Sequence, residues 1–364
     1  MEDDFGESKI LLETIWHWDA VKDSKDESVL VIDAHPDKPW ILFTPSGSNV
    51  LQMWNYEDGK QVGSWRMPDG RSPDKVKFIV QKDWIVVQSM DCFKVYEFAV
   101  GKRLRHIEEW RSPTRRDNSP LALTVDRRST HVLTGFRDGR VLLWDWGRKQ
   151  GRIKTFKGHD EPVTCLAFHP RLSIFASAAG DVSIRVWNME AHPISQSFCL
   201  YSHCGGPVHS MEFHSGLETT VLMTGHHGST VKIWNYKKQR CVVELEGNNE
   251  ESVSTFFHPH SPYVFSASKK GKVTIWRKSE SNFELMAIAI HTGLSGQLYS
   301  MVPCRNFNEI IIGGNGEFKV LKVVAIRQDD AASVPALPGL EKEKEPVTAA
   351  AVTENTEAQL LPGL

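Results

Sequence analysis

The sequence predicts an all-β fold: a single seven-bladed β-propeller followed by a disordered C-terminal tail. Two observations predict it. A short strand-like segment recurs seven times at spacings of 42 to 48 residues, and repeats of about 40–45 residues with four strands each are typical of propeller blades. One repeat also carries a His, a Ser, an Asp and a Trp at offsets that allow one buried hydrogen-bond relay.

The recurring segment is predicted to be a strand in every blade. Its seven copies align on Trp54, Tyr96, Trp144, Trp187, Trp234, Trp276 and Leu321. Between them, short alternating or apolar runs are separated by Gly, Pro and Asp residues, which favours consecutive antiparallel strands. Seven such blades fill residues 9–325, and we predict one propeller domain over that range.

The relay is predicted in the fourth repeat, between Gly158 and Asn188. We expect the Asp181 carboxylate to accept from the ring of His159, which bonds Ser177, which in turn meets the indole N–H of Trp187. Each buried polar group needs a partner, and each bond contributes about 1 kcal/mol net. The pattern is similar to a WD repeat. The other repeats carry only partial sets, so we expect them to rely on apolar packing between sheets.

The two ends of the chain are predicted to behave differently from the blades. Residues 1–8 are polar and expected to be flexible, whereas Lys9–Ile15 contains an apolar run. We expect that run to complete the seventh blade, since the Phe318 strand would otherwise leave an open sheet edge. Residues 326–364 are rich in Ala, Pro and Glu and are predicted to be a disordered tail.

Composition narrows the classes of function. The net charge of −2 points to no nucleic-acid ligand. The six Cys form no CxxC pair, which predicts reduced thiols in a cytoplasmic protein. The acidic start predicts no signal peptide. No apolar run reaches membrane-spanning length, so any association with a membrane is expected to be peripheral.

Two clusters contain residue types that carry chemistry elsewhere. His203, Cys204, His209 and His214 lie close in sequence, but their spacing matches no structural zinc pattern. His159, Ser177 and Asp181 are the residue types of a hydrolytic triad, but a nucleophile is not expected beneath a Trp. We therefore predict no metal site, no cofactor and no enzymatic activity.

A charge asymmetry runs from Lys102 to Lys157, with 15 Lys and Arg against 6 Asp and Glu. A basic sector over the second and third blades would suit phosphoinositide head groups, RNA or an acidic partner. The alternative is a solvated outer rim with scattered counter-charges, and this interpretation is preferred.

Several runs resemble one family. His35–Leu42, Lys77–Val86, Trp144–Trp146 and Cys241–Gly247 are similar to the N-terminal propeller of the coatomer β′ subunit. The resemblance extends over about residues 9–325. It implies a role in the coat of Golgi-derived vesicles, where this propeller recognises dilysine sorting signals at the C-termini of cargo tails.

The chain departs from that family in two ways. The family's chain continues into a second propeller and a helical solenoid, whereas this sequence has one propeller and a tail. In the family, an Arg and a Lys that lead into the first blade contact the cargo carboxylate; here those positions read Ser28 and Leu30, and Lys22 matches only with a shifted insertion. Glu212 matches the acidic residue that meets the cargo lysine. The resemblance therefore implies dilysine recognition that is weakened or lost.

The sequence thus predicts a non-enzymatic scaffold that binds proteins or peptide tails, with coatomer subunits as the expected partners. It is expected in the cytoplasm, peripheral on Golgi or coated-vesicle membranes, in vesicle-mediated transport between Golgi and endoplasmic reticulum. The alternative is an adaptor in another complex, such as a substrate receptor of a ubiquitin ligase. Against it, the Trp-Asp-x-Arg box of such adaptors is misplaced here, because Arg148 stands one position too late after Trp144.

Overall fold

The structure is a computed structural model that describes residues 9–19, 29–45, 48–90, 92–111, 118–148, 152–191, 196–201, 206–214, 220–227, 230–246, 252–258, 263–278, 283–289, 294, 296–304, 309–314 and 317–326. All regular secondary structure within these ranges is β-strand. No helix in these ranges is long and apolar enough to span a membrane.

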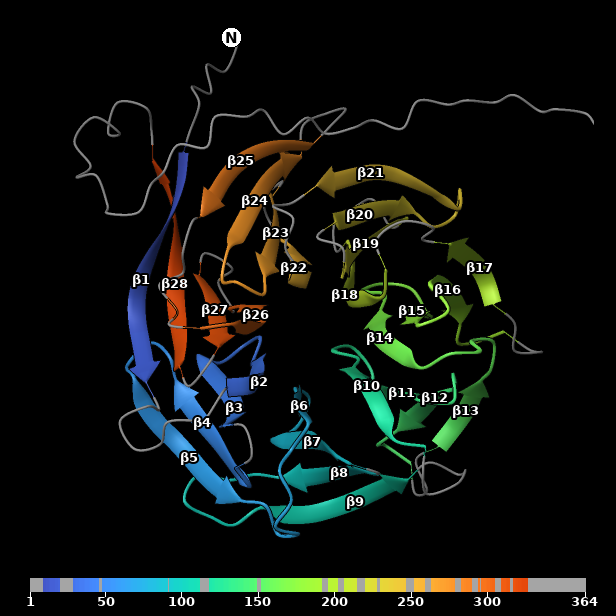
Figure 1. Ribbon diagram of the computed structural model, residues 1–364. Coiled ribbons are helices and arrows are strands. Elements are labelled where there is room, and N and C mark those ends of the chain that lie inside the picture. Colours follow the sequence, from blue (N-terminus) through green and yellow to red (C-terminus); the bar gives the residue numbers. More distant parts are fainter. Residues whose placement is uncertain are drawn as a thin grey trace, which may run out of the picture.

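The strands form seven four-stranded antiparallel sheets arranged in a ring, which confirms the predicted seven-bladed propeller (Figure 1). The innermost strand of each sheet lines the central channel. These inner strands are β2 (Val29–Ala34), β6 (Lys75–Ile79), β10 (Pro120–Val125), β14 (Val163–Phe168), β18 (Val208–Phe213), β22 (Ser252–Phe257) and β26 (Leu298–Pro303).

Each inner strand is followed outward by the next strands in chain order. The second strands are β3 (Trp40–Pro45), β7 (Trp84–Ser89), β11 (His131–Phe136), β15 (Ile174–Ala179), β19 (Val221–His226), β23 (Tyr263–Ser268) and β27 (Glu309–Gly314). The third strands are β4 (Val50–Asn55), β8 (Cys92–Glu97), β12 (Val141–Asp145), β16 (Ser183–Asn188), β20 (Thr230–Asn235), β24 (Val273–Lys278) and β28 (Glu317–Ile326). The outer strands are β5 (Lys60–Arg66), β9 (Arg105–Arg111), β13 (Arg152–Phe156), β17 (Gln196–Tyr201), β21 (Arg240–Glu246), β25 (Phe283–Ala289) and β1 (Lys9–Asp19).

The apolar patterns of the strands follow from their place in the ring. The second and third strands are covered on both faces by neighbouring blades, so β12 is buried at every position and β15 at every position but the first. Such strands read as nearly continuous apolar runs. The outer strands lie at the rim, and in β5 only Trp65 is buried.

The hydrophobic core is divided among the seven interfaces between blades. Each of seven clusters of buried apolar side chains joins two neighbouring sheets, and together they run once around the ring. At the interface between the seventh and first blades, for example, the rings of Phe318 and Phe43 lie 4.9 Å apart. Every blade therefore depends on both neighbours for burial of its apolar faces.

The ring is closed by the strand nearest the start of the chain. β1 pairs antiparallel with β28, from Lys9 opposite Ile326 to Asp19 opposite Glu317, with a register shift between Thr14 and Trp16. It extends four residues beyond the predicted Lys9–Ile15 segment. The first and last parts of the chain thus share one sheet, and β28 has a partner on both sides. The predicted flexible start, residues 1–8, and the predicted tail, residues 326–364, lie outside the described residues except for Ile326, which ends β28.

Candidate functional site

The fourth blade brings His159, Ser177, Asp181 and Trp187 into one connected set of hydrogen bonds. The Trp187 Nε1–H donates to Ser177 Oγ at 2.8 Å, and the Ser177 hydroxyl lies 2.7 Å from His159 Nε2. The other ring nitrogen, Nδ1, lies 2.9 Å from an Asp181 carboxylate oxygen. Ser183 Oγ also donates to Asp181, at 2.7 Å. The set links the approach to the inner strand with the second and third strands of the blade.

Burial fixes the charges in this relay. Loss of solvent lowers the pKa of His159, although Asp181 acts in the opposite direction. Burial alone would raise the pKa of Asp181, but hydrogen bonds from Ser183 and His159 bring that pKa below its ordinary value. At neutral pH the relay therefore holds a neutral imidazole and an ionised carboxylate. Ser177 has no exposed surface, so its hydroxyl is not placed as an accessible nucleophile.

Two other blades contain one hydrogen bond of the same relay, from the Trp indole to a hydroxyl in the second strand. Trp144 donates to Thr134 at 2.7 Å in the third blade, and Trp234 donates to Thr224 at 2.8 Å in the fifth. In the fifth blade the Thr224 hydroxyl also lies 2.8 Å from Nε2 of His226. The expected apolar packing between sheets is present at these blades, and the Thr hydroxyl in addition supplies the acceptor that a buried indole N–H requires.

Glu212, the residue matched to the cargo lysine, lies at the channel near the end of β18. One of its carboxylate oxygens accepts the backbone N–H of Phe257, in the next blade, at 2.7 Å. Burial raises the pKa of Glu212 to about 7, although this hydrogen bond and the charge of Arg127 act to lower it. The carboxyl is therefore partly protonated at neutral pH and already has a partner across the blade interface.

Asp33, which was not among the predicted site residues, occupies the equivalent position in the first blade. It accepts the backbone N–H of Phe78 at 2.9 Å and forms an ion pair with Lys77 at 2.7 Å. A local signal was present, since Asp33 and Glu212 each stand two residues before a His at the end of an inner strand. Asp33 and Lys77, together with Arg127, line a small pocket of about 100 Å³.

Of the two predicted cargo-tail residues, only Glu212 lies within the described residues, so its pairing with Lys22 stays a prediction. Lys22 and Ser28 lie outside the described residues, and Leu30 is in β2. Glu212 is level with Asp33, near the end of the inner strands.

The histidine cluster gives no metal site in the part of the chain that the structure describes. His203 and Cys204 fall outside that part. The rings of His209 and His227 lie 5.5 Å apart. No group of three or more potential ligands among the described residues could hold a metal ion.

The basic sector is broken up by ion pairs along the rim. Its paired arginines and their partners are Arg105 with Glu97, Arg111 with Glu109, Arg140 with Asp138 and Arg148 with Asp145. Lys102 and Arg103 are different, because within the described residues neither side chain forms an ion pair, and both line a groove at the edge of the second blade.

Family comparison agrees with the repeat pattern. The model of the family "WD domain, G-beta repeat" matches residues 150–188, which contain the relay, and residues 239–277. The chain has seven four-stranded sheets in a closed ring. It is therefore a WD-repeat β-propeller.

Among WD-repeat proteins, the chain is similar in sequence to coatomer beta' subunits. The chain is 30% identical over 239 residues to coatomer subunit beta'-1 of Arabidopsis thaliana, which covers 65% of this chain and 25% of the relative. It is 28% identical over 311 residues to coatomer subunit beta' of Rattus norvegicus, covering 85% of this chain and 33% of the relative. The chain thus matches about a quarter to a third of the length of these relatives. The predicted resemblance is confirmed: this is a WD-repeat propeller similar in sequence to coatomer beta' subunits.

Proposed function

We propose that the chain is a non-enzymatic scaffold that binds proteins or peptide tails, of the kind present in coatomer beta' subunits, and that it acts in vesicle-mediated transport between Golgi and endoplasmic reticulum. The observation that carries this proposal is the 28% identity to a coatomer beta' subunit over 85% of the chain. Its expected place is the cytoplasm and the surface of Golgi membranes, with coatomer subunits as partners.

Within this role, recognition of dilysine cargo tails is weakened or lost. A lysine ammonium binds best to an ionised, available carboxylate. Glu212 has a pKa raised to about 7 and accepts the Phe257 N–H. Ser28 and Leu30 stand where the coatomer resemblance calls for an Arg and a Lys, and neither side chain supplies a cation for the cargo carboxylate.

Affinity purification of the tagged chain from its own cytosol tests the scaffold proposal. Mass spectrometry should recover coatomer subunits well above the level of a tagged control propeller. A different complex recovered in the absence of coatomer would overturn the assignment to the vesicle coat. Co-purification of a cullin adaptor in its place would favour the ligase-adaptor alternative.

Calorimetry with synthetic cargo-tail peptides tests the proposed weakening of dilysine recognition. A peptide ending in a dilysine signal should bind no more than about threefold more tightly than its diserine counterpart, since the matched cations are missing. A preference above about tenfold, abolished by Glu212→Gln, would contradict the proposed loss of dilysine recognition.

A further inference from the structure

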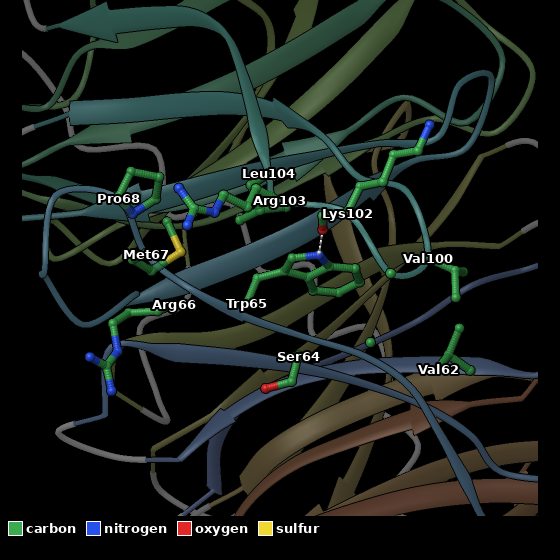
Figure 2. Close-up of a pocket in the computed structure, with 12 residues that line it drawn as sticks. Val62, Ser64, Trp65, Arg66, Met67, Pro68, Val100, Lys102, Arg103 and Leu104 are labelled. Carbon is green, nitrogen blue, oxygen red and sulfur yellow. Dashed lines mark hydrogen bonds between the residues drawn. The ribbon is translucent and has the colours of Figure 1, made fainter.

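A groove on the outer rim, remote from the channel, lies between the first and second blades. Its volume is about 1020 Å³. One wall is formed by β5 and the residues that follow it, and the other by Val100–Leu104, which leads into β9 (Figure 2). This volume is at the upper end of the range for pockets that take ligands.

The floor of the groove is apolar and held in place. Trp65 is buried, and its Nε1–H donates to the backbone oxygen of Lys102 at 2.8 Å, which ties the two walls together. The ring lies flat against β5 because residue 63 is a glycine: a Cβ there would lie 2.3 Å from the Trp65 ring. Val100, at the edge of the groove, is 60% exposed. An apolar side chain from a ligand would therefore meet preformed apolar surface.

The rim of the groove is positively charged. Of the twelve residues that line it, Arg66 on one wall and Lys102 and Arg103 on the other are cations, and none is acidic. Within the described part of the chain, these three side chains have no hydrogen bond or ion pair. Nearby cations differ, since Lys94 pairs with Asp69 at 2.8 Å. Uncompensated cations on facing walls favour an anionic partner.

We propose that this groove binds an extended acidic peptide segment of a partner protein, anchored by an apolar side chain. The apolar anchor contacts Val62, Val100 and Leu104, which line the groove around buried Trp65, and the carboxylates pair with Arg66 and Arg103. A recessed groove with an apolar floor suits a peptide better than a flat lipid surface. The proposal concerns a surface apart from the channel and does not depend on the role in vesicle transport.

Fluorescence anisotropy with a labelled peptide of glutamates and two central leucines tests this assignment. The double variant Lys102→Glu/Arg103→Glu should weaken binding at least tenfold. The matched control is Lys237→Glu/Lys238→Glu, an exposed pair in the fifth blade with the same change in net charge. The control should weaken binding less than twofold. Exchange of the two leucines for serine should also weaken binding, because the anchor is lost.

Several outcomes would overturn the proposal. Equal weakening by both double variants would show a net-charge effect without a site, and undetectable binding of the peptide would exclude it directly. Stronger binding to vesicles containing anionic lipid than to the peptide, lost in the Lys102→Glu/Arg103→Glu variant, would assign the groove to a membrane surface. Peptide binding only after removal of residues 327–364 would make this chain's own tail the occupant.

Discussion

At the scale of single residues, the buried polar groups of the propeller differ in how completely they are hydrogen-bonded. His159, Ser177 and Asp181 satisfy one another, and Trp187 completes the set. Glu212 is less fully compensated, with one hydrogen bond across a blade interface and a raised pKa. The relay is therefore expected to serve stability, whereas Glu212 is expected to respond to pH.

Replacement of Asp181 by Ala is expected to lower the free energy of unfolding by about 1–3 kcal/mol, since it removes the carboxylate that accepts from buried His159 and from Ser183. The pKa of Asp181 is lowered by folding, so this contribution is complete above the ordinary value of 3.8 and disappears as the pH falls through the folded-state pKa. Urea denaturation at pH 7 and at lower pH measures it. Asp160→Ala, an exposed neighbour, is the control. Loss of partner binding without a loss of stability would contradict the structural role.

Glu212→Gln, unlike Asp181→Ala, should raise the free energy of unfolding relative to wild type, and the gain should increase with pH. The folded-state pKa is raised from 4.5 to about 7. Between these values the folded protein binds more protons than the unfolded chain, so stability falls as the pH rises. The neutral Gln removes this cost, and the variant should gain on the order of 1–2 kcal/mol relative to wild type between pH 5 and pH 8. Exposed Glu161→Gln should show no such trend. An unchanged difference at the two pH values would show that Glu212 titrates normally.

At the scale of elements, the outermost strands determine where the molecule is open. All seven sheets end at the rim in an outer edge strand, and in the seventh sheet that strand is β1, from the other end of the sequence. β5 differs from the other described outer strands, because the Trp65 ring packs over Gly63. Together they form the floor of the groove that Arg66, Lys102 and Arg103 line.

Deletion of residues 1–19 is expected to expose β28 as a sheet edge, since β1 pairs with it from Lys9 to Asp19. The melting temperature should fall by at least about 5 °C, and size-exclusion chromatography should show self-association. Deletion of residues 1–8 alone is the control and should leave both unchanged. A monomer of unaltered melting temperature after the longer deletion would show that β1 does not close the ring in solution.

At the scale of the whole molecule, stability is spread around a ring. Each apolar cluster joins two blades, so no sheet has a core of its own. Consecutive inner strands contact one another through all seven blades, including β26 with β2. Damage at one interface is therefore expected to propagate to the others.

Phe318→Ala tests this cooperativity at the interface where the ring closes. Phe318 has no exposed surface and packs against Phe43, so its truncation should cost about 3–5 kcal/mol. Calorimetry should show one transition displaced to lower temperature. Two separate transitions would show that the first and seventh blades unfold independently of the rest. Exposed Val242→Ala is the matched control.

The sequence by itself determined the repeat, the number of blades and the resemblance to coatomer beta', because strand alternation and the recurring Trp are local patterns that repeat along the chain. It also placed His159, Ser177, Asp181 and Trp187 within one blade, where their offsets are short. Only the tertiary structure decided the contacts between blades. The hydrogen bonds of Glu212 with Phe257 and of Asp33 with Phe78, and the groove between Arg66 and Arg103, all join residues of neighbouring blades, and their distances depend on how the sheets pack.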